Sequence, residues 1–188
     1  MDNYPYIIAT LPDLVLDFAE KPFDFTALSE SVKQLCSDKD VRLIEWLEAG
    51  QKEENRSHYF YHSVTRIGNG FLKKYFDLDC TLRKAKVAYL EKRVSDIPSD
   101  LRASLLPLFG TSNLIEREKS IDKYMWDRIS EMVPYGEFSI DTILSVLAKA
   151  AIVGRWGKLD SESGGILFKN LVNEVRGTFS GAKFDSQE

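Results

Sequence analysis

The sequence predicts an all-α protein, a bundle of roughly seven to eight helices. Apolar side chains recur every three or four residues through most of the 188-residue chain. Residues that cap helix N-termini, chiefly Ser, Asp and Asn, stand immediately before several of these stretches. No segment shows the sustained alternation of apolar and polar residues that marks a half-buried strand. A chain of this length can bury a core as one domain or as two small ones.

Residues 1–50 are expected to form an N-terminal helical segment. Its lead-in, residues 4–16, carries two prolines and predicts extended or irregular packing. One helix is expected after Thr26, and another after an N-cap at Ser37 or Asp38, ending at Gly50. The inward stripes of these helices are Leu28, Val32 and Leu35 in the first and Val41, Ile44 and Leu47 in the second.

The main helical domain is expected over residues 58–177, after a charged linker at residues 51–57. Residues 58–76 are rich in aromatics and keep helical spacing, although Gly68 and Gly70 weaken that helix by about 1 kcal/mol each. Asp77 is expected to cap a helix over residues 77–93. A short helix over residues 101–109 follows and ends at Gly110; Pro107 disfavours a regular last turn.

Two strongly patterned helices form the centre of this domain. Asn113 can cap the first, with Glu116 as the third residue of a capping box. Its apolar stripe is Leu114, Ile121, Met125, Ile129 and Met132, while Asp122 is assigned to the polar faces. After a turn at residues 134–136, the second helix covers residues 139–156, with Ser139 as N-cap. That helix is apolar on nearly every face, which is typical of a central core helix.

The C-terminal part predicts one more helix and a tail. Leu167, Leu171 and Val175 share a helical face, and Gly177 is the expected C-cap. Residues 178–188 are expected to form a flexible tail.

The two helices over residues 77–93 and 139–156 show an internal match at an offset of 62 residues. Leu82 aligns with Leu144, and Arg93 aligns with Arg155. A structural repeat would explain the match. Two unrelated helices that follow the same capping rules, with a hydrophobic staple, an acid in the first turn and Arg in the last, would explain it equally well.

Composition excludes several classes of protein. The net charge is −4, which argues against a general binder of nucleic acid or anionic membranes. No stretch reaches the roughly 20 apolar residues of a membrane span, and the N-terminus lacks the basic region of a signal peptide. Cys36 and Cys80 form no metal or redox spacing and are interpreted as reduced thiols. We therefore expect a cytoplasmic protein.

Catalytic and metal-binding motifs are not found in the sequence. It contains no phosphate-binding loop and no nucleophile motif, so no cofactor and no catalytic residue are expected. His58 and His62 are four residues apart, as in a metal-binding pair, but no third ligand is placed by spacing. Structural or surface roles for these histidines are favoured over a small helical metalloenzyme. The aromatic residues over 59–76 fit core packing, with a partner-binding face as the alternative.

Four segments resemble an uncharacterised bacterial family encoded with V/A-type ATPase subunits. They read YPYIIATLPDL, FLKKYFDLDCTLRKAKVAYLEKR, NLIEREKSIDKYMW and FSIDTILSVLAKAAIVGRWGKL. That family is similar to the V/A-type ATPase component that links the central stalk to the rotor ring, which we call the stalk–rotor linker. The resemblance covers most of the chain and is strongest over residues 71–93 and 114–159.

The resemblance implies an all-helical fold of repeated units and a mechanical role. The stalk–rotor linker sits on the membrane rotor ring, receives the foot of the central stalk and transmits torque without catalysis. By resemblance, the partners are the stalk and rotor-ring subunits, and the protein is peripheral to the membrane without inserting into it. The positions expected to bind a partner are Arg93, Lys149, Arg155 and Trp156, while Asp79 and Leu82 are expected to position helices.

The chain is shorter than a full stalk–rotor linker, which leaves a second interpretation open. A free-standing helical adaptor could keep the family fold and bind proteins unrelated to the ATPase. The two interpretations differ in their partners and agree on the absence of catalysis.

Overall fold

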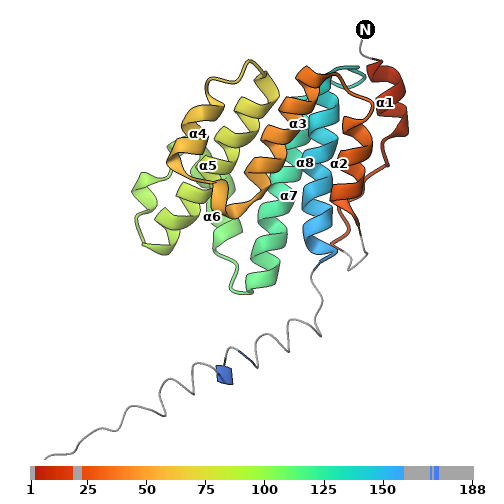
Figure 1. The fold of residues 1–188 in the computed structure, drawn as a ribbon. Coiled ribbons are helices and arrows are strands. Elements are labelled where there is room, and N and C mark those ends of the chain that lie inside the picture. Colours follow the sequence, from red (N-terminus) through yellow and green to blue (C-terminus); the bar gives the residue numbers. More distant parts are fainter. Residues whose placement is uncertain (1–2, 19–22, 159–169, 171, 174–188) are drawn as a thin grey trace, which may run out of the picture.

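The computed structural model describes residues 3–18, 23–158, 170 and 172–173, and the described chain is entirely helical. It confirms the predicted all-α bundle, with eight α-helices, two short 3₁₀ helices and no strand in these residues (Figure 1). The elements are α1 Tyr4–Thr10, α2 Phe25–Lys33, α3 Asp38–Gln51, η1 Glu53–Asn55, α4 His58–Val64, α5 Gly70–Leu90, η2 Val94–Asp96, α6 Ser99–Phe109, α7 Leu114–Met132 and α8 Ile140–Trp156.

Helix α8 is the centre of the bundle, as its all-round apolar sequence predicts. It packs against α1, α2, α3, α5 and α7, and Figure 1 shows it in blue between α7 and α2. Its fully buried side chains include Ile143, Leu144 and Leu147, each with no exposed surface. The segment α1–α3 therefore shares one hydrophobic core with the rest of the described chain.

The aromatic stretch forms two helices, so the predictions of one helix over residues 58–76 and of a cap at Asp77 are wrong. Helix α5 begins at Gly70, and Asp77 lies inside it. The N-cap is Asn69, whose side chain accepts a hydrogen bond from the Leu72 backbone N–H at 2.8 Å. The Asn69 amide also donates to Asp141 in the first turn of α8, at 2.5 Å. A contact with a helix more than 70 residues away thus fixes this boundary, which local spacing cannot reveal.

The N-terminal lead-in is partly helical, which corrects the prediction of irregular structure over residues 4–16. Helix α1 tolerates Pro5 because the proline lies in the first turn, where its missing N–H has no helical acceptor. Ile7 is buried in the core, and the Tyr4 hydroxyl donates to Asp40 in α3 at 2.9 Å. The later residues 12–18 are not helical.

Other predicted boundaries hold to within two residues. Ser37 caps α3, Asn113 caps α7 through the backbone N–H groups of Ile115 and Glu116, and Gly136 turns the chain with a φ of 77°. Helix α6 begins two residues earlier than predicted. It continues through Pro107 to Phe109, so the proline does not end it.

The internal match at an offset of 62 holds for the buried stripe and fails at the helix starts. Leu82 and Leu144 are both buried. Phe76 is also buried, whereas its counterpart Phe138 is 59% exposed and forms no buried staple. Because α5 begins well before the aligned position, the two helices share an inward face without sharing their capping structure.

None of the described helices combines the length and apolarity needed to cross a bilayer. The helix predicted over residues 165–177 and the tail at 178–188 lie outside the described residues, except for residues 170, 172 and 173, which are helical.

Close packing of α3 on α5 requires a glycine at position 50. An ideal Cβ built on Gly50 would lie 2.1 Å from Cε1 of Phe76 and 2.9 Å from Cζ of Phe60. Both rings are in the core, so neither can move into solvent. A side chain at this position therefore forces the helices apart or the rings out of their rotamers.

We expect Gly50→Ala to lower the free energy of unfolding by about 1–3 kcal/mol, because it overpacks this contact. Urea denaturation followed by circular dichroism measures the change. Gly70→Ala is the matched control, since a Cβ there meets nothing within 4 Å. Equal stability of the two variants would contradict the packing constraint.

Candidate functional site

A groove of about 700 Å³ runs between α5, α7 and α8, with the end of α3 and η1 at one side. We call it the interhelix groove. Apolar side chains lie within it, among them Leu82, Ile121, Met125 and Ile152. Its other lining residues include five basic ones, Arg56, Arg83, Lys86, Arg155 and Lys158, and four acidic ones, Glu53, Asp79, Glu118 and Asp122. Alternating charge around an apolar floor can recognise a protein surface.

Asp122 of α7 anchors α8 at one end of this groove. It is 6% exposed, and its Oδ2 accepts hydrogen bonds from the guanidinium of Arg155 and from the indole Nε1 of Trp156, the latter at 2.6 Å. Trp156 is buried, whereas the Arg155 side chain is 54% exposed and reaches the groove. One carboxylate thus joins the last turn of α8 to the middle of α7.

Burial raises the pKa of Asp122, and the charge and hydrogen bond of Arg155 together with the hydrogen bond of Trp156 act in the opposite direction. The sequence prediction that Asp122 lies on a polar face is wrong. Asp122 is three residues before Met125 and seven before Ile129, so it shares their buried face. That spacing is the signal that could have identified it.

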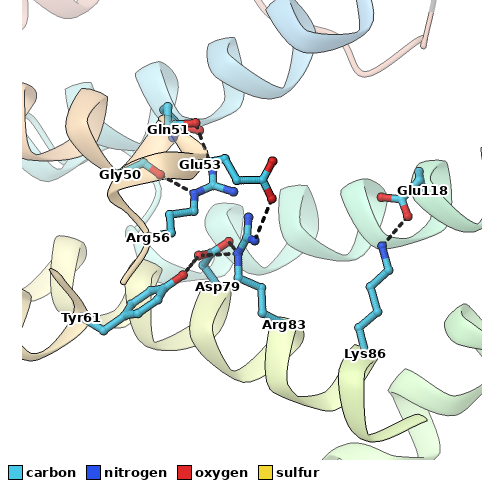
Figure 2. Close-up of polar contacts among 9 residues, drawn as sticks. All are labelled: Gly50, Gln51, Glu53, Arg56, Tyr61, Asp79, Arg83, Lys86 and Glu118. Carbon is cyan, nitrogen blue, oxygen red and sulfur yellow. Dashed lines mark hydrogen bonds and ion pairs between the residues drawn. The ribbon is translucent and has the colours of Figure 1, made fainter. Parts of the chain in front are cut away.

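A second polar cluster lies where α4, α5 and η1 meet (Figure 2). The Tyr61 hydroxyl donates to Asp79 Oδ2 at 2.5 Å, and Arg83 Nε lies 3.1 Å from the same oxygen. The other end of the Arg83 guanidinium reaches Glu53 at 3.8 Å. Because Glu53 is 87% exposed, that outer contact adds at most about 1 kcal/mol.

Burial is the main cause that raises the pKa of Asp79, and the hydrogen bond from Tyr61 opposes it. Burial and the Asp79 hydrogen bond also raise the pKa of Tyr61. The prediction that Asp79 positions helices agrees with this geometry, because its carboxylate joins α5 to α4.

Arg56 closes the C-terminus of α3 beside this cluster. Its Nε donates to the Gly50 carbonyl at 2.5 Å, and its Nη2 donates to the Gln51 carbonyl at 3.4 Å (Figure 2). The Gln51 amide donates to the hydroxyl of buried Tyr75 at 3.0 Å. Burial raises the pKa of Tyr75 to about 12, with the Gln51 hydrogen bond acting against it. The residues predicted as a linker therefore satisfy the carbonyls at the end of α3.

Lys86 and Glu118 form the contact between α5 and α7. The Lys86 ammonium lies 2.5 Å from Glu118 Oε1, and Figure 2 shows the two side chains reaching across the space between the helices. Both are about one-third exposed, so the pair borders the interhelix groove without being sealed from water.

Of the four predicted partner-binding residues, the structure brings together only Arg155 and Trp156. Lys149 lies elsewhere on α8, with its ammonium 5.1 Å from the ring centre of Trp126, and burial lowers its pKa. Arg93 lies beyond the end of α5 and pairs with Glu91 and Asp96. Trp156 is 7% exposed, so it supports the groove from beneath.

The histidine pair does not form a metal centre within the described residues, where no group of three potential ligands occurs. Nε2 of His62 lies 3.1 Å from the guanidinium of Arg66. Cys36 and Cys80 are not joined in a disulfide.

A protein family described as "Protein of unknown function (DUF2764)" matches residues 94–178. The matched range includes α6, α7 and α8 and therefore Asp122, Arg155 and Trp156, but not Asp79 or Arg83. Comparison with curated proteins finds no match, and comparison with solved structures also finds none.

We expect Asp122→Ala to lower the free energy of unfolding by about 1–3 kcal/mol, because it leaves the buried Trp156 N–H without an acceptor. Thermal or urea unfolding measures the loss. Asp127→Ala on the same helix is the control, since the exposed Lys123–Asp127 pair at 3.3 Å contributes about 0.5 kcal/mol or less. Equal effects of the two substitutions would show that Asp122 does not anchor α8.

The raised pKa of Asp79 predicts a pH dependence of stability. The folded state holds the Asp79 proton more tightly than the unfolded state, so this carboxyl adds stability as the pH falls from about 7 to about 4. Wild type should therefore gain stability relative to Asp79→Asn over that range, measured by urea denaturation at each pH. Asp127→Asn controls for loss of a surface carboxylate. A gap that moves toward Asp79→Asn would contradict the sign.

Proposed function

We propose that this chain is a non-catalytic subunit or accessory of a V/A-type rotary ATPase, located at the junction of central stalk and rotor ring. The observation that carries the proposal joins sequence to structure. The two segments of strongest resemblance, residues 71–93 and 114–159, contain α5, α7 and α8, which are the helices that frame the interhelix groove.

A mechanical role needs helices that keep their relative positions under load, and polar contacts join every pair of these three helices. Lys86 and Glu118 join α5 to α7. Asp122 joins α7 to the end of α8 through Arg155 and Trp156. At the opposite end of α8, Asp141 accepts from Asn69 at the start of α5. Together with the shared core, these contacts support a rigid body that can transmit force.

The groove also offers groups that a partner can reach. Lys158 is exposed and Arg155 is half-exposed, and both lie beside apolar side chains of α8 and α7. In an interface, such rim charges would set orientation and association rate, while the apolar floor would supply most of the affinity.

Affinity purification of the tagged full-length protein from native membranes, read by mass spectrometry, tests the proposal. We expect stalk and rotor-ring subunits in the eluate, and their recovery should fall several-fold with Lys158→Glu, which reverses a groove charge. Lys39→Glu is the matched control, because Lys39 is exposed at the start of α3 and does not line the groove. Recovery of only unrelated proteins would instead support the free-standing adaptor, and recovery of ATPase subunits unaffected by Lys158→Glu would move the interface elsewhere.

A further inference from the structure

A second groove, of about 730 Å³, lies between α4 and α5 and concentrates positive charge. We call it the basic groove. Five Lys or Arg residues line it, together with His58 and His62 and a single acid, Asp77. The five are Arg56, Lys73, Lys74, Arg83 and Lys84. With the histidines neutral, five cations and one anion give this groove a formal charge of +4. Since the chain as a whole carries −4, the remaining residues carry −8.

The lysines of this groove are not neutralised by the described part of the chain. Lys73, Lys74 and Lys84 are exposed, and none forms an ion pair with a described residue. In contrast, Arg83 is held by Asp79, and Arg56 donates to the end of α3. Gathering like charges on one face costs free energy, and an anionic partner would relieve that repulsion.

The shape and floor of the basic groove favour an extended partner. Lys73 and Lys84 are eleven residues apart on α5, so the cations spread over about 16 Å of helix. Apolar surface accompanies them, because Val64 and Phe76 also line the groove. A small anion would engage only part of such a row, whereas a helix or extended segment could follow it and place apolar side chains between the charges.

We propose that the basic groove binds an acidic, amphipathic segment of a partner protein. The partner's carboxylates would pair with Lys73, Lys74 and Lys84, and its apolar side chains would contact the floor beside Val64 and Phe76. A protein segment is favoured over nucleic acid or an anionic membrane, because the −8 carried by the rest of the chain repels an extended polyanionic surface. The inference concerns a different groove from the proposed ATPase contact and does not depend on it.

Fluorescence anisotropy of the full-length protein with a labelled synthetic peptide tests this inference. The probe is an amphipathic helix-forming peptide of about 20 residues with Glu on one face and Leu on the other, long enough to cover the row of lysines. We expect saturable binding that weakens with added salt. The triple reversal K73E/K74E/K84E should lower the affinity at least tenfold.

The matched control is K39E/R42E/K52E, which changes the net charge equally at exposed positions outside the groove. It should bind the peptide within about twofold of wild type, because exposed charges beyond a Debye length are screened. Circular dichroism confirms that each variant is folded, and K73Q/K74Q/K84Q replaces the reversal if that variant fails to fold. Equal loss in both triple variants would overturn the proposal. So would no peptide binding, or a groove-dependent affinity for a single-stranded oligonucleotide or phosphatidylserine vesicles that exceeds the affinity for the peptide.

Discussion

The structure depends on the burial of α8, a helix with apolar side chains on nearly all sides. Such a helix cannot rest on one neighbour, because any uncovered face would leave apolar surface in water at about 25 cal/mol per Å². Five other helices pack around it, including α1 and α2 from the N-terminal segment. The order of the bundle follows from this requirement: elements distant in sequence must converge on one central helix.

Polar contacts then fix how the surrounding helices sit on this core. Asp122 receives both Arg155 and Trp156 at the last turn of α8, and Asn69 donates to Asp141 at its first turn. Apolar packing alone is tolerant of small rotations and shifts, whereas a buried carboxylate loses free energy when a donor moves away. The hydrogen bonds at its two ends therefore give α8 a defined position against α7 and α5.

The same architecture leaves two grooves with different electrostatic character on either side of the Tyr61–Asp79–Arg83 cluster. The interhelix groove mixes charges of both signs over an apolar floor, whereas the basic groove carries cations that the described chain does not neutralise. Arg56 and Arg83 line both. A protein with two separate recognition surfaces on one rigid body suits a linking role between partners, which is the character that the proposed ATPase function requires.

The sequence by itself determined the helical class, the central place of α8 and the caps at Ser37 and Asn113, because these depend on periodicity and on hydrogen bonds within three residues. Only the tertiary structure decided that α5 begins at Asn69 and that Asp122 is buried. Each of these depends on a donor or acceptor supplied by α8, far away in the sequence. Local spacing states which face a residue occupies, but the neighbour that covers that face is chosen by the packing of the whole chain. The two grooves belong to the same category, since each is formed by side chains from helices that local sequence cannot bring together.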